Sequence, residues 1–309
     1  MSGHEPVMLE EALAGLAIRA GVSARPRIFI DATYGRGGHS GAILSRLSAG
    51  DTLYALDRDP EAVVHGRAAF GDRAGSMAEF EIEQRNFAEL AGWAAQRHLL
   101  GRVDGLLMDL GVSSPQLDEA ERGFSFTVDG PLDMRMDPTT GESAADWLAR
   151  AGEAEIADVL WRCGEERNSR RIARRIVEQR ALQPLATTRQ LAELVAAVPG
   201  PRSHKIHPAT RTFQALRIHL NGELQALDAA LAALPALLAP GGRVAIISFH
   251  SLEDRRVKRC LKEGALRVRS GETLPAVFAR PRRCFPSAAE VARNPRARSA
   301  VLRVVERLP

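Results

Sequence analysis

Three short apolar segments in the first part of the chain each end at an aspartate, and helix-like stretches separate them. The segments and their aspartates are 28–30 with Asp31, 52–56 with Asp57, and 103–108 with Asp109. Short strands that alternate with helices are typical of a parallel sheet covered by helices on both faces. Because parallel strands end at the same edge of their sheet, we expect the three carboxylates to gather there.

This α/β pattern is interrupted in the middle of the chain. Residues 117–142 are rich in Gly, Pro, Asp and Met and predict a long ordered loop, and residues 143–198 read as helices. A helical segment over 221–238 and a strong apolar strand over 244–249 then resume the pattern. We therefore predict a Rossmann-like α/β fold with an inserted helical domain. The predicted boundaries are 1–116 for the first part of the α/β domain, 117–213 for the loop and helical substrate-recognition insertion, and 214–309 for the second part.

Composition narrows the class of protein. The chain has 309 residues, of which 45% are hydrophobic and 26% charged, as in ordinary globular proteins. No apolar run is long enough to span a bilayer, and the first residues lack the pattern of a signal peptide. Cys163, Cys260 and Cys284 are too widely spaced for a metal-ligand pair or a disulfide framework. We expect a cytoplasmic protein without a metal site.

Charge is distributed unevenly along the chain. Residues 251–309 hold 15 Lys or Arg against 6 Asp or Glu, which gives this segment a net charge of +9, whereas the whole chain carries +4. Such asymmetry suits a polyanionic partner. A solvated basic surface without a partner is the alternative.

A glycine-rich loop follows the first apolar segment. Gly35, Gly37 and Gly38 allow a tight turn and close approach of a ligand to the backbone, and Asp57 can accept hydrogen bonds from a ribose. NAD and S-adenosylmethionine both fit such a loop. Carboxylates at Asp31 and Asp109 would repel a pyrophosphate but attract an ammonium or sulfonium group, so they favour S-adenosylmethionine. Both aspartates could also simply cap the turns that follow them.

Two further residues near this loop leave alternatives open. His39 could donate a hydrogen bond to a cofactor carboxylate or cap its own helix. Phe87, after the third predicted strand, could stack on an adenine or pack beneath the loop.

Eight sequence runs together resemble the bacterial small-subunit (16S) rRNA cytosine-N4-methyltransferases. The runs are His4–Met8, Tyr34–Ser40, Leu56–Pro60, Asp109–Gln116, Gly123–Phe126, Pro131–Met136, Ser248–Arg255 and Asn294–Ser299. The resemblance extends over nearly the whole chain. Tyr34 stands where phenylalanine is more often expected.

This resemblance implies a class I S-adenosylmethionine-dependent methyltransferase fold with a helical insertion. It also implies that 16S rRNA, within the small ribosomal subunit, is the partner, that one cytidine of the decoding region is the target, and that no membrane or obligatory protein partner is needed. The implied cofactor contacts are Gly37, Gly38, His39, Asp57, Phe87, Asp109 and Gln116. Asp31 is added on the charge argument alone.

The loop after Asp109 is the candidate catalytic segment. The exocyclic N4 of cytosine is a poor nucleophile, and hydrogen-bond acceptors aimed at its N–H groups would localise its lone pair. Amine methyltransferases often place an Asp/Asn/Ser-Pro-Pro-aromatic motif here. The sequence has Ser113, Ser114 and Pro115 without the second proline or the aromatic residue. We predict that Ser113 or Ser114 contacts N4, and an ordinary Ser-Pro turn is the alternative.

Other chemistry-bearing residues are weaker candidates. Methylation at cytosine C5 would need a cysteine nucleophile, and none of the three cysteines lies in a strand-end loop. His250, at the end of the strong apolar strand, could be a base, bind the substrate base, or only hydrogen-bond at the strand end. Five arginines of the insertion could clamp a substrate or form a solvated helix face with nearby glutamates, namely Arg167, Arg170, Arg171, Arg174 and Arg175.

Other function classes remain open at this point. The chain could methylate another amine, in DNA or protein. It could also be a non-catalytic rRNA-binding assembly factor that retains a cofactor pocket.

Overall fold

A computed structural model describes residues 6–18, 25–71, 78–200, 206–265, 267–269 and 272–309. His4 and Glu5, at the start of the first resemblance run, lie outside the described residues. The chain forms two compact units, which we call the sheet unit (Met1–Gly111 with Leu224–Pro309) and the helical unit (Val112–Glu223).

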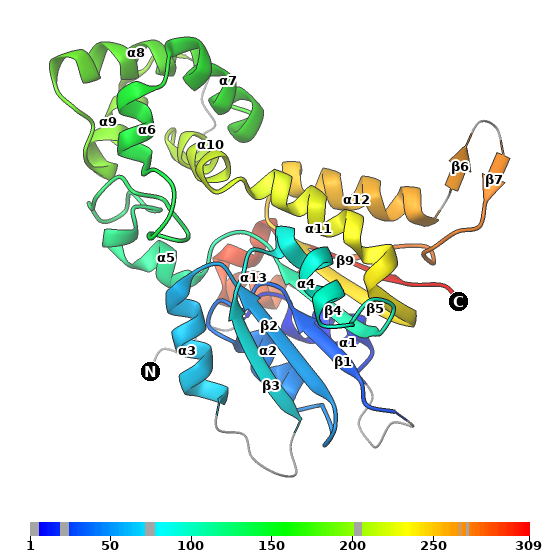
Figure 1. The fold of residues 1–309 in the computed structure, drawn as a ribbon. Helices are drawn as coiled ribbons and strands as arrows, with labels where there is room; N and C mark the ends of the chain where they lie inside the picture. Colours follow the sequence, from blue (N-terminus) through cyan, green and yellow to red (C-terminus); the bar gives the residue numbers. More distant parts are fainter. Residues whose placement is uncertain (1–5, 19–24, 72–77, 201–205, 266, 270–271) are drawn as a thin grey trace. The chain divides into compact units, whose positions relative to one another are not determined.

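The sheet unit is built on a seven-stranded, mostly parallel sheet in the order β3-β2-β1-β4-β5-β9-β8 (Figure 1). Its strands are β1 (Ile28–Asp31), β2 (Thr52–Asp57), β3 (Glu79–Gln84), β4 (Val103–Asp109), β5 (Leu238–Ser248), β8 (Arg282–Cys284) and β9 (Val301–Glu306). The first five are parallel neighbours, and β9 runs antiparallel to both β5 and β8. A separate hairpin pairs β6 (Arg267–Arg269) with β7 (Glu272–Leu274). The predicted α/β class with a mostly parallel sheet is confirmed.

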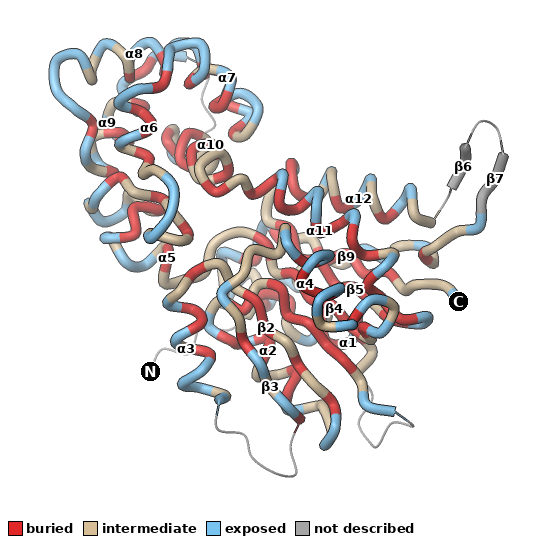
Figure 2. Tube along the Cα trace, viewed as in Figure 1, coloured by how far each residue is buried: buried red, intermediate tan, exposed pale blue. Residues whose placement is uncertain are grey.

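Helices cover both faces of this sheet because successive strand residues point to opposite sides. Ile30, Leu106 and Ile246 pack in one apolar layer with α4, α11 and α12. Phe29 and Leu107 pack in the opposite layer with α1 and α2, and the central strands β1, β4 and β5 are buried along most of their length (Figure 2). The helices are α1 (Leu9–Leu16), α2 (Gly38–Leu44), α3 (Pro60–Phe70), η1 (Phe87–Glu89), α4 (Leu90–Gln96), α11 (Glu223–Leu237), α12 (Ser251–Ala265), α13 (Ala288–Arg293) and η3 (Pro295–Ser299).

The helical unit has an apolar core of its own. Trp147, Leu160, Ile176 and Leu216 are buried together in it. Its elements are α5 (Ser114–Asp118), η2 (Ala120–Arg122), α6 (Ala144–Arg150), α7 (Glu153–Gly164), α8 (Ser169–Leu182), α9 (Thr188–Ala197) and α10 (Thr210–Asn221). Side-chain caps fix several helix starts, as at α9, where Thr187 Oγ1 accepts a hydrogen bond from the Gln190 N–H.

The structure corrects the predicted segmentation in two places. The units meet at 111/112 and 223/224, not at 116/117 and 213/214. The second boundary was wrong because Phe213 and Leu216 of α10 belong to the core of the helical unit. The helix predicted over 221–238 is α11 and begins two residues later, at Glu223, because Asn221 is the last residue of α10 and Gly222, with φ +59°, ends that helix.

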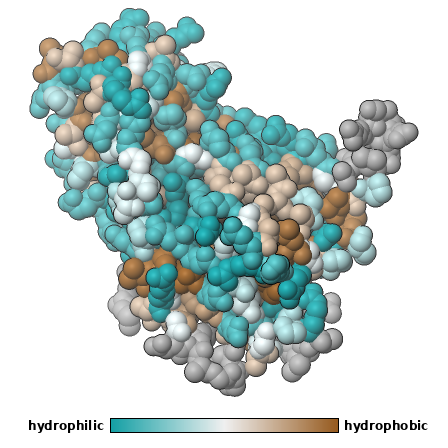
Figure 3. Space-filling model, in the orientation of Figure 1, coloured by the Kyte–Doolittle hydropathy of each residue, from teal (hydrophilic) through white to brown (hydrophobic). Residues whose placement is uncertain are grey.

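Among the described residues, no helix is long and apolar enough to cross a membrane. The outward side of α12 is largely hydrophilic (Figure 3), in keeping with exposed Lys258 and Arg259.

Candidate active site

The carboxyl ends of β1, β2 and β4 bring the three predicted aspartates to one edge of the sheet. Asp31 is level with Ala55 of β2 and with Leu107 of β4. The Asp109 N–H donates to Thr33 Oγ1 at 2.6 Å, which ties the loop after β1 to the end of β4. Strand β1 pairs with β2 on one side and with β4 on the other, so the strand order reverses at β1. Open α/β sheets bind their ligands at such a reversal.

Asp31 and Asp57 are held by the loops that follow them. Asp31 Oδ2 accepts from Ser40 Oγ at 2.7 Å, and Asp31 Oδ1 accepts from the Thr33 N–H. Asp57 accepts one backbone N–H on each oxygen, from Gly35 at 2.7 Å and from Asp59 at 2.9 Å. Burial outweighs these hydrogen bonds and raises the pKa of each carboxyl to about 6.

Asp109 and His39 face one another at the same edge. Asp109 Oδ2 lies 3.6 Å from His39 Nδ1, while Asp109 Oδ1 and His39 Nε2 are covered and accept or donate no hydrogen bond within the described part of the chain. Burial raises the pKa of Asp109 well above 3.8, with smaller contributions from the charges of Asp31 and Glu253. Burial also lowers the pKa of His39 to about 4, so its ring is neutral.

The glycine loop is shaped by close packing. Gly37, with φ +74°, precedes the first turn of α2, and a Cβ there would lie 2.5 Å from Tyr34 Oη. A Cβ on Gly38 would lie 2.3 Å from Pro6, so the N-terminal segment covers the loop. Tyr34, where phenylalanine was expected, has its hydroxyl 2.9 Å from His65 Nδ1, which satisfies the buried oxygen.

Phe87 lies in η1, just after β3, and packs partly buried against the main apolar layer of the sheet. This packing gives Phe87 a role in the core, and stacking on an adenine stays a prediction. In the same unit, an open recess of about 460 Å³ is lined by Arg36 and by the first turns of α3, namely Pro60, Glu61, Val64 and His65.

These residues fit a cationic nucleoside ligand. Within the described residues, no arginine or lysine forms an ion pair with Asp31, Asp57 or Asp109. Buried carboxylates without a cation are costly, and a ligand with positive charge would compensate them. A pyrophosphate would add negative charge to the same edge. No cluster of His, Cys, Asp and Glu suited to a metal is found among the residues that could be searched.

His250 is folded back onto the first turn of α12. Its Nδ1 accepts from the Glu253 N–H at 3.4 Å, and its Nε2 lies 3.2 Å from Glu253 Oε1, outside hydrogen-bonding geometry. Glu253 Oε2 in turn accepts from the Phe249 N–H at 2.9 Å. The arrangement favours a strand-end, structural role for His250 over that of a free base. Sequence reasoning missed Glu253, although an acid in the first turn of the predicted helix after the strand was a signal of a helix cap.

The candidate catalytic segment belongs to the helical unit, where it starts a helix and is not an irregular loop. Ser113 precedes α5, Ser114 and Pro115 form its first turn, and all three are half-buried. The Gln116 side-chain oxygen accepts the Ser113 N–H at 3.0 Å. The Gln116 side chain thus caps the start of α5.

Some of the basic residues form ion pairs, and others are exposed. In the sheet unit, Arg256 pairs with Asp228, whereas Lys258 and Arg259 are exposed. In the helical unit, Arg175 pairs with Glu178. Other exposed arginines are Arg167, Arg170, Arg282, Arg283, Arg293, Arg296 and Arg298.

Comparison with known proteins identifies relatives over nearly the whole chain. The model of the MraW methylase family matches residues 1–308. A protein from Thioalkalivibrio sulfidiphilus named "Ribosomal RNA small subunit methyltransferase H" is 56% identical over 99% of this chain and 97% of its own length.

Solved structures give a more distant likeness. A putative rRNA-methylase from Clostridium thermocellum is 11% identical, with a TM-score of 0.43, over 99% of this chain and 100% of its own. The methyltransferase NodS from Bradyrhizobium japonicum, in complex with S-adenosyl-L-homocysteine, is 10% identical, with a TM-score of 0.41, over 99% of this chain and 90% of its own. Scores at this level are too low to establish a shared fold by themselves.

Proposed function

The chain belongs to the MraW methylase family, and from this premise we propose that it methylates N4 of one cytidine in 16S rRNA. It is a methyltransferase, and its methyl donor is S-adenosylmethionine. The main support for an RNA substrate is the 56% identity, over almost the full length of both chains, to a protein named as a small-subunit rRNA methyltransferase. The assembled small subunit in the cytoplasm is the proposed setting.

The sheet unit is proposed to hold the methyl donor. The donor supplies an electrophilic methyl group on a sulfonium. Asp57 accepts from the ribose, Asp31 and Asp109 face the positive charge, and His39 contacts the amino acid part through Nε2. The Gly37–Gly38 backbone lies against the ligand, and Phe87 stacks on its adenine. Asp109 Oδ1 and His39 Nε2 support this assignment because both are covered polar atoms that still lack a hydrogen-bond partner among the described residues.

The segment after Asp109 is proposed to hold the target amine. Ser113 or Ser114 supplies an oxygen that accepts a hydrogen bond from the N4 amino group, which draws the nitrogen lone pair out of conjugation. As the bond from N4 to the methyl carbon forms and the bond from that carbon to sulfur breaks, N4 gains positive charge, and its extra proton is released to water. Pro115 fixes the first turn of α5 and therefore the direction of both serines. His250 accepts the Glu253 N–H at the start of α12, and Gln116 accepts the Ser113 N–H at the start of α5. Both side chains therefore hold the start of a helix in place.

The serines can be tested by replacing each one with alanine and then both together. We expect kcat to fall about 10²-fold or more in the double variant while the Kd for the methyl donor stays within threefold, because one positioned acceptor is typically worth that much. Unchanged turnover in the double variant would reject the assignment. The variant Ser125→Ala, in the same unit but outside the segment, is the matched control.

The function itself is tested by transfer of a labelled methyl group. The full-length protein is incubated with small ribosomal subunits that lack the modification, with naked 16S rRNA, and with DNA, and the labelled nucleoside is then identified. We expect N4-methylcytidine from the subunits. Label on C5, on DNA or on protein would refute the proposal, and tight rRNA binding without any methyl product would indicate an assembly factor.

A further inference from the structure

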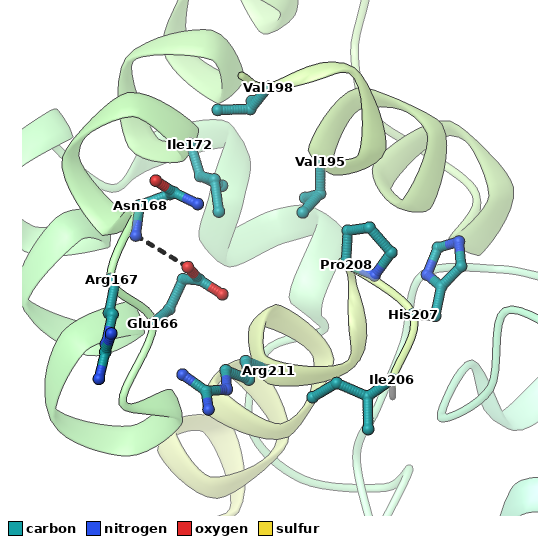
Figure 4. A pocket seen from close by; sticks show the side chains of 10 residues that line it. All are labelled: Glu166, Arg167, Asn168, Ile172, Val195, Val198, Ile206, His207, Pro208 and Arg211. Carbon is teal, nitrogen blue, oxygen red and sulfur yellow. Dashed lines mark hydrogen bonds between the residues drawn. The ribbon is translucent and has the colours of Figure 1, made fainter. Parts of the chain in front are cut away.

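The helical unit holds a cavity of about 270 Å³ around Glu166, whose side chain accepts the Asn168 N–H (Figure 4). Ile206 forms part of its wall and directly follows residues 201–205, which lie outside the described part of the chain. The boundary of this cavity is therefore incomplete. The sheet unit offers a better defined arrangement, which links its C-terminal part to the cofactor edge.

One peptide group near the N-terminus is held from both of its ends. The Met8 N–H donates to Glu290 Oε1 of α13 at 2.6 Å. The Val7 carbonyl, at the other end of the same peptide group, accepts a hydrogen bond from the His39 ring of α2. A trans peptide is planar, and its N–H and C=O point in opposite directions, so a contact that fixes one of them also fixes the other. Glu290 and His39 are therefore coupled through one rigid group.

The segment that contains this peptide group, residues 6–8, is packed tightly against the cofactor edge. Met8 is fully buried and has a φ of +51°, which is uncommon for a residue with a side chain. Such a conformation persists where the surroundings hold it, and here the buried Glu290 carboxylate holds the N–H. Pro6 lies directly over the start of α2, since a Cβ on Gly38 would lie 2.3 Å from its ring.

These contacts decide which ring nitrogen of His39 carries the hydrogen. A carbonyl can only accept, so the nitrogen that faces Val7 is the protonated one. Nε2 makes no hydrogen bond within the described residues, which leaves Nδ1 as the donor to Val7. Burial lowers the pKa of His39 to about 4, and a neutral ring has a single N–H. Nε2 is therefore an acceptor, which suits the ammonium group of S-adenosylmethionine and not its carboxylate.

We propose that Glu290 is a positioning residue for binding of the methyl donor, and that it acts on His39 through the peptide group between Val7 and Met8. The proposal rests on the function proposed above, in which His39 contacts the amino acid part of the donor. Glu290 fixes the peptide N–H, the peptide carbonyl holds Nδ1–H, and Nε2 accepts from the ligand. A carboxylate on the N–H also polarises the peptide group and strengthens its carbonyl as an acceptor. The hydrogen bond at one nitrogen thereby sets the state of the other.

Calorimetric titration of the full-length protein with S-adenosylmethionine tests this chain of contacts. Glu290→Ala removes the acceptor and should raise the Kd about tenfold or more, the typical effect of losing a hydrogen bond to a charged group. Glu290→Gln keeps an oxygen in the same place and should stay within about twofold, whereas Glu290→Asp withdraws it by one methylene and should bind at least about threefold more weakly. The kcat for small ribosomal subunits at saturating methyl donor should stay within about twofold in all three, because only binding is affected.

A control variant and a double variant separate this role from general stability. Asp104→Ala is the matched control, because Asp104 Oδ2 accepts the Ile28 N–H at 2.9 Å at the start of β1, away from the cofactor edge. It loses a comparable backbone contact and should change the Kd less than about twofold. In a His39→Ala background, Glu290→Ala should weaken binding by less than a further factor of about two, since residues that act through one another are not additive.

The tautomer of His39 is a readout that a purely structural role would not move. Long-range proton–nitrogen correlation spectra of ligand-free protein with isotope-labelled histidine show which ring nitrogen is protonated. The variant His39→Gln identifies the signals of His39 among the eight histidines. We expect the hydrogen on Nδ1 in the unmodified protein and in Glu290→Gln, and a mixture of both tautomers in Glu290→Ala.

Three results would overturn the proposal. The first is a hydrogen on Nε2 in the unmodified protein, which depends on no variant that must fold. The others are a Kd for Glu290→Asp equal to that of the unmodified protein, and an effect of Glu290→Ala that is as large without His39 as with it. If the protein binds the donor as expected but methylates no RNA, the proposed function fails and the role of Glu290 stands. If the unmodified protein does not bind the donor, both fail.

Discussion

Binding of S-adenosylmethionine should weaken as the pH falls through 6. Burial raises the pKa of Asp31 and of Asp57 to about 6, from an ordinary value of 3.8. For an acid, a raised pKa means that folding disfavours the ionised form, so protons are taken up as the pH falls through about 6 and the negative charge that attracts the ligand is lost. His39, with a pKa of about 4, stays neutral over this range and contributes nothing to the change.

The magnitude follows from the fraction of ionised carboxylate. A group with a pKa of about 6 is about nine-tenths ionised at pH 7 and about one-tenth ionised at pH 5. If the ligand binds only the ionised form, its Kd rises about tenfold over this range for each required carboxylate, which corresponds to about 1.4 kcal/mol. If both Asp31 and Asp57 must be ionised, the increase is about a hundredfold.

Calorimetric titrations of the full-length protein with S-adenosylmethionine, from pH 5 to pH 7 at constant ionic strength, measure this effect. Repeating them in buffers with different ionisation enthalpies counts the protons released on binding. Asp57→Asn should bind more weakly at pH 7 and lose about one proton from the pH dependence. Circular dichroism at each pH verifies that the protein stays folded. A Kd that varies less than threefold over this range in the folded protein would refute the electrostatic account of the site.

Three more predictions concern single residues of the site. Gly37→Ala should destabilise the protein by about 1–3 kcal/mol more than Gly50→Ala in thermal melts, because both positions have positive φ but only Gly37 has a neighbour, Tyr34, where the Cβ would lie; equal effects would show that the contact is unimportant. Asp109→Asn should raise the stability of the ligand-free protein by about 1 kcal/mol and weaken cofactor binding at least tenfold, since it removes a desolvated charge that the ligand compensates; a destabilised variant would contradict this. Glu253→Gln should move the pH profile of cofactor binding to lower pH, because the charge of Glu253 contributes to the raised pKa of Asp109; an unchanged profile would exclude that coupling.

The strand ends were predictable from sequence because apolar runs that stop at an acid have few other interpretations. Asp31, Asp57 and Asp109 end β1, β2 and β4. The sequence could not reveal what each carboxylate accepts, since the Ser40 and Gly35 contacts depend on the turn that the glycines adopt. The three carboxylates still favour a positively charged ligand. Asp31 and Asp57, however, already accept hydrogen bonds from their own loops.

Elsewhere, local signals were outweighed by tertiary packing or missed. Ser113–Gln116 was read as a loop from its small residues and proline, yet proline is tolerated in a first helical turn and the Gln116 side chain caps the Ser113 N–H. The end of the insertion was placed within α10 because helix periodicity alone does not tell which core a helix joins. The cavity around Glu166 was not predictable, because its walls come from segments more than 40 residues apart in sequence.

The sheet unit joins the two ends of the chain, and this has a consequence for biosynthesis. The Met8 N–H donates to Glu290 Oε1 at 2.6 Å, across 282 positions of sequence, and β9 completes the sheet between β5 and β8. All core residues of the helical unit, by contrast, have been translated by residue 223. Domains fold as their residues emerge, so the insertion can acquire its structure while the methyl-donor site still waits for its last strand. A ribosome that terminates early therefore releases a chain without a finished catalytic unit, and only complete translation yields an enzyme able to act on other ribosomes.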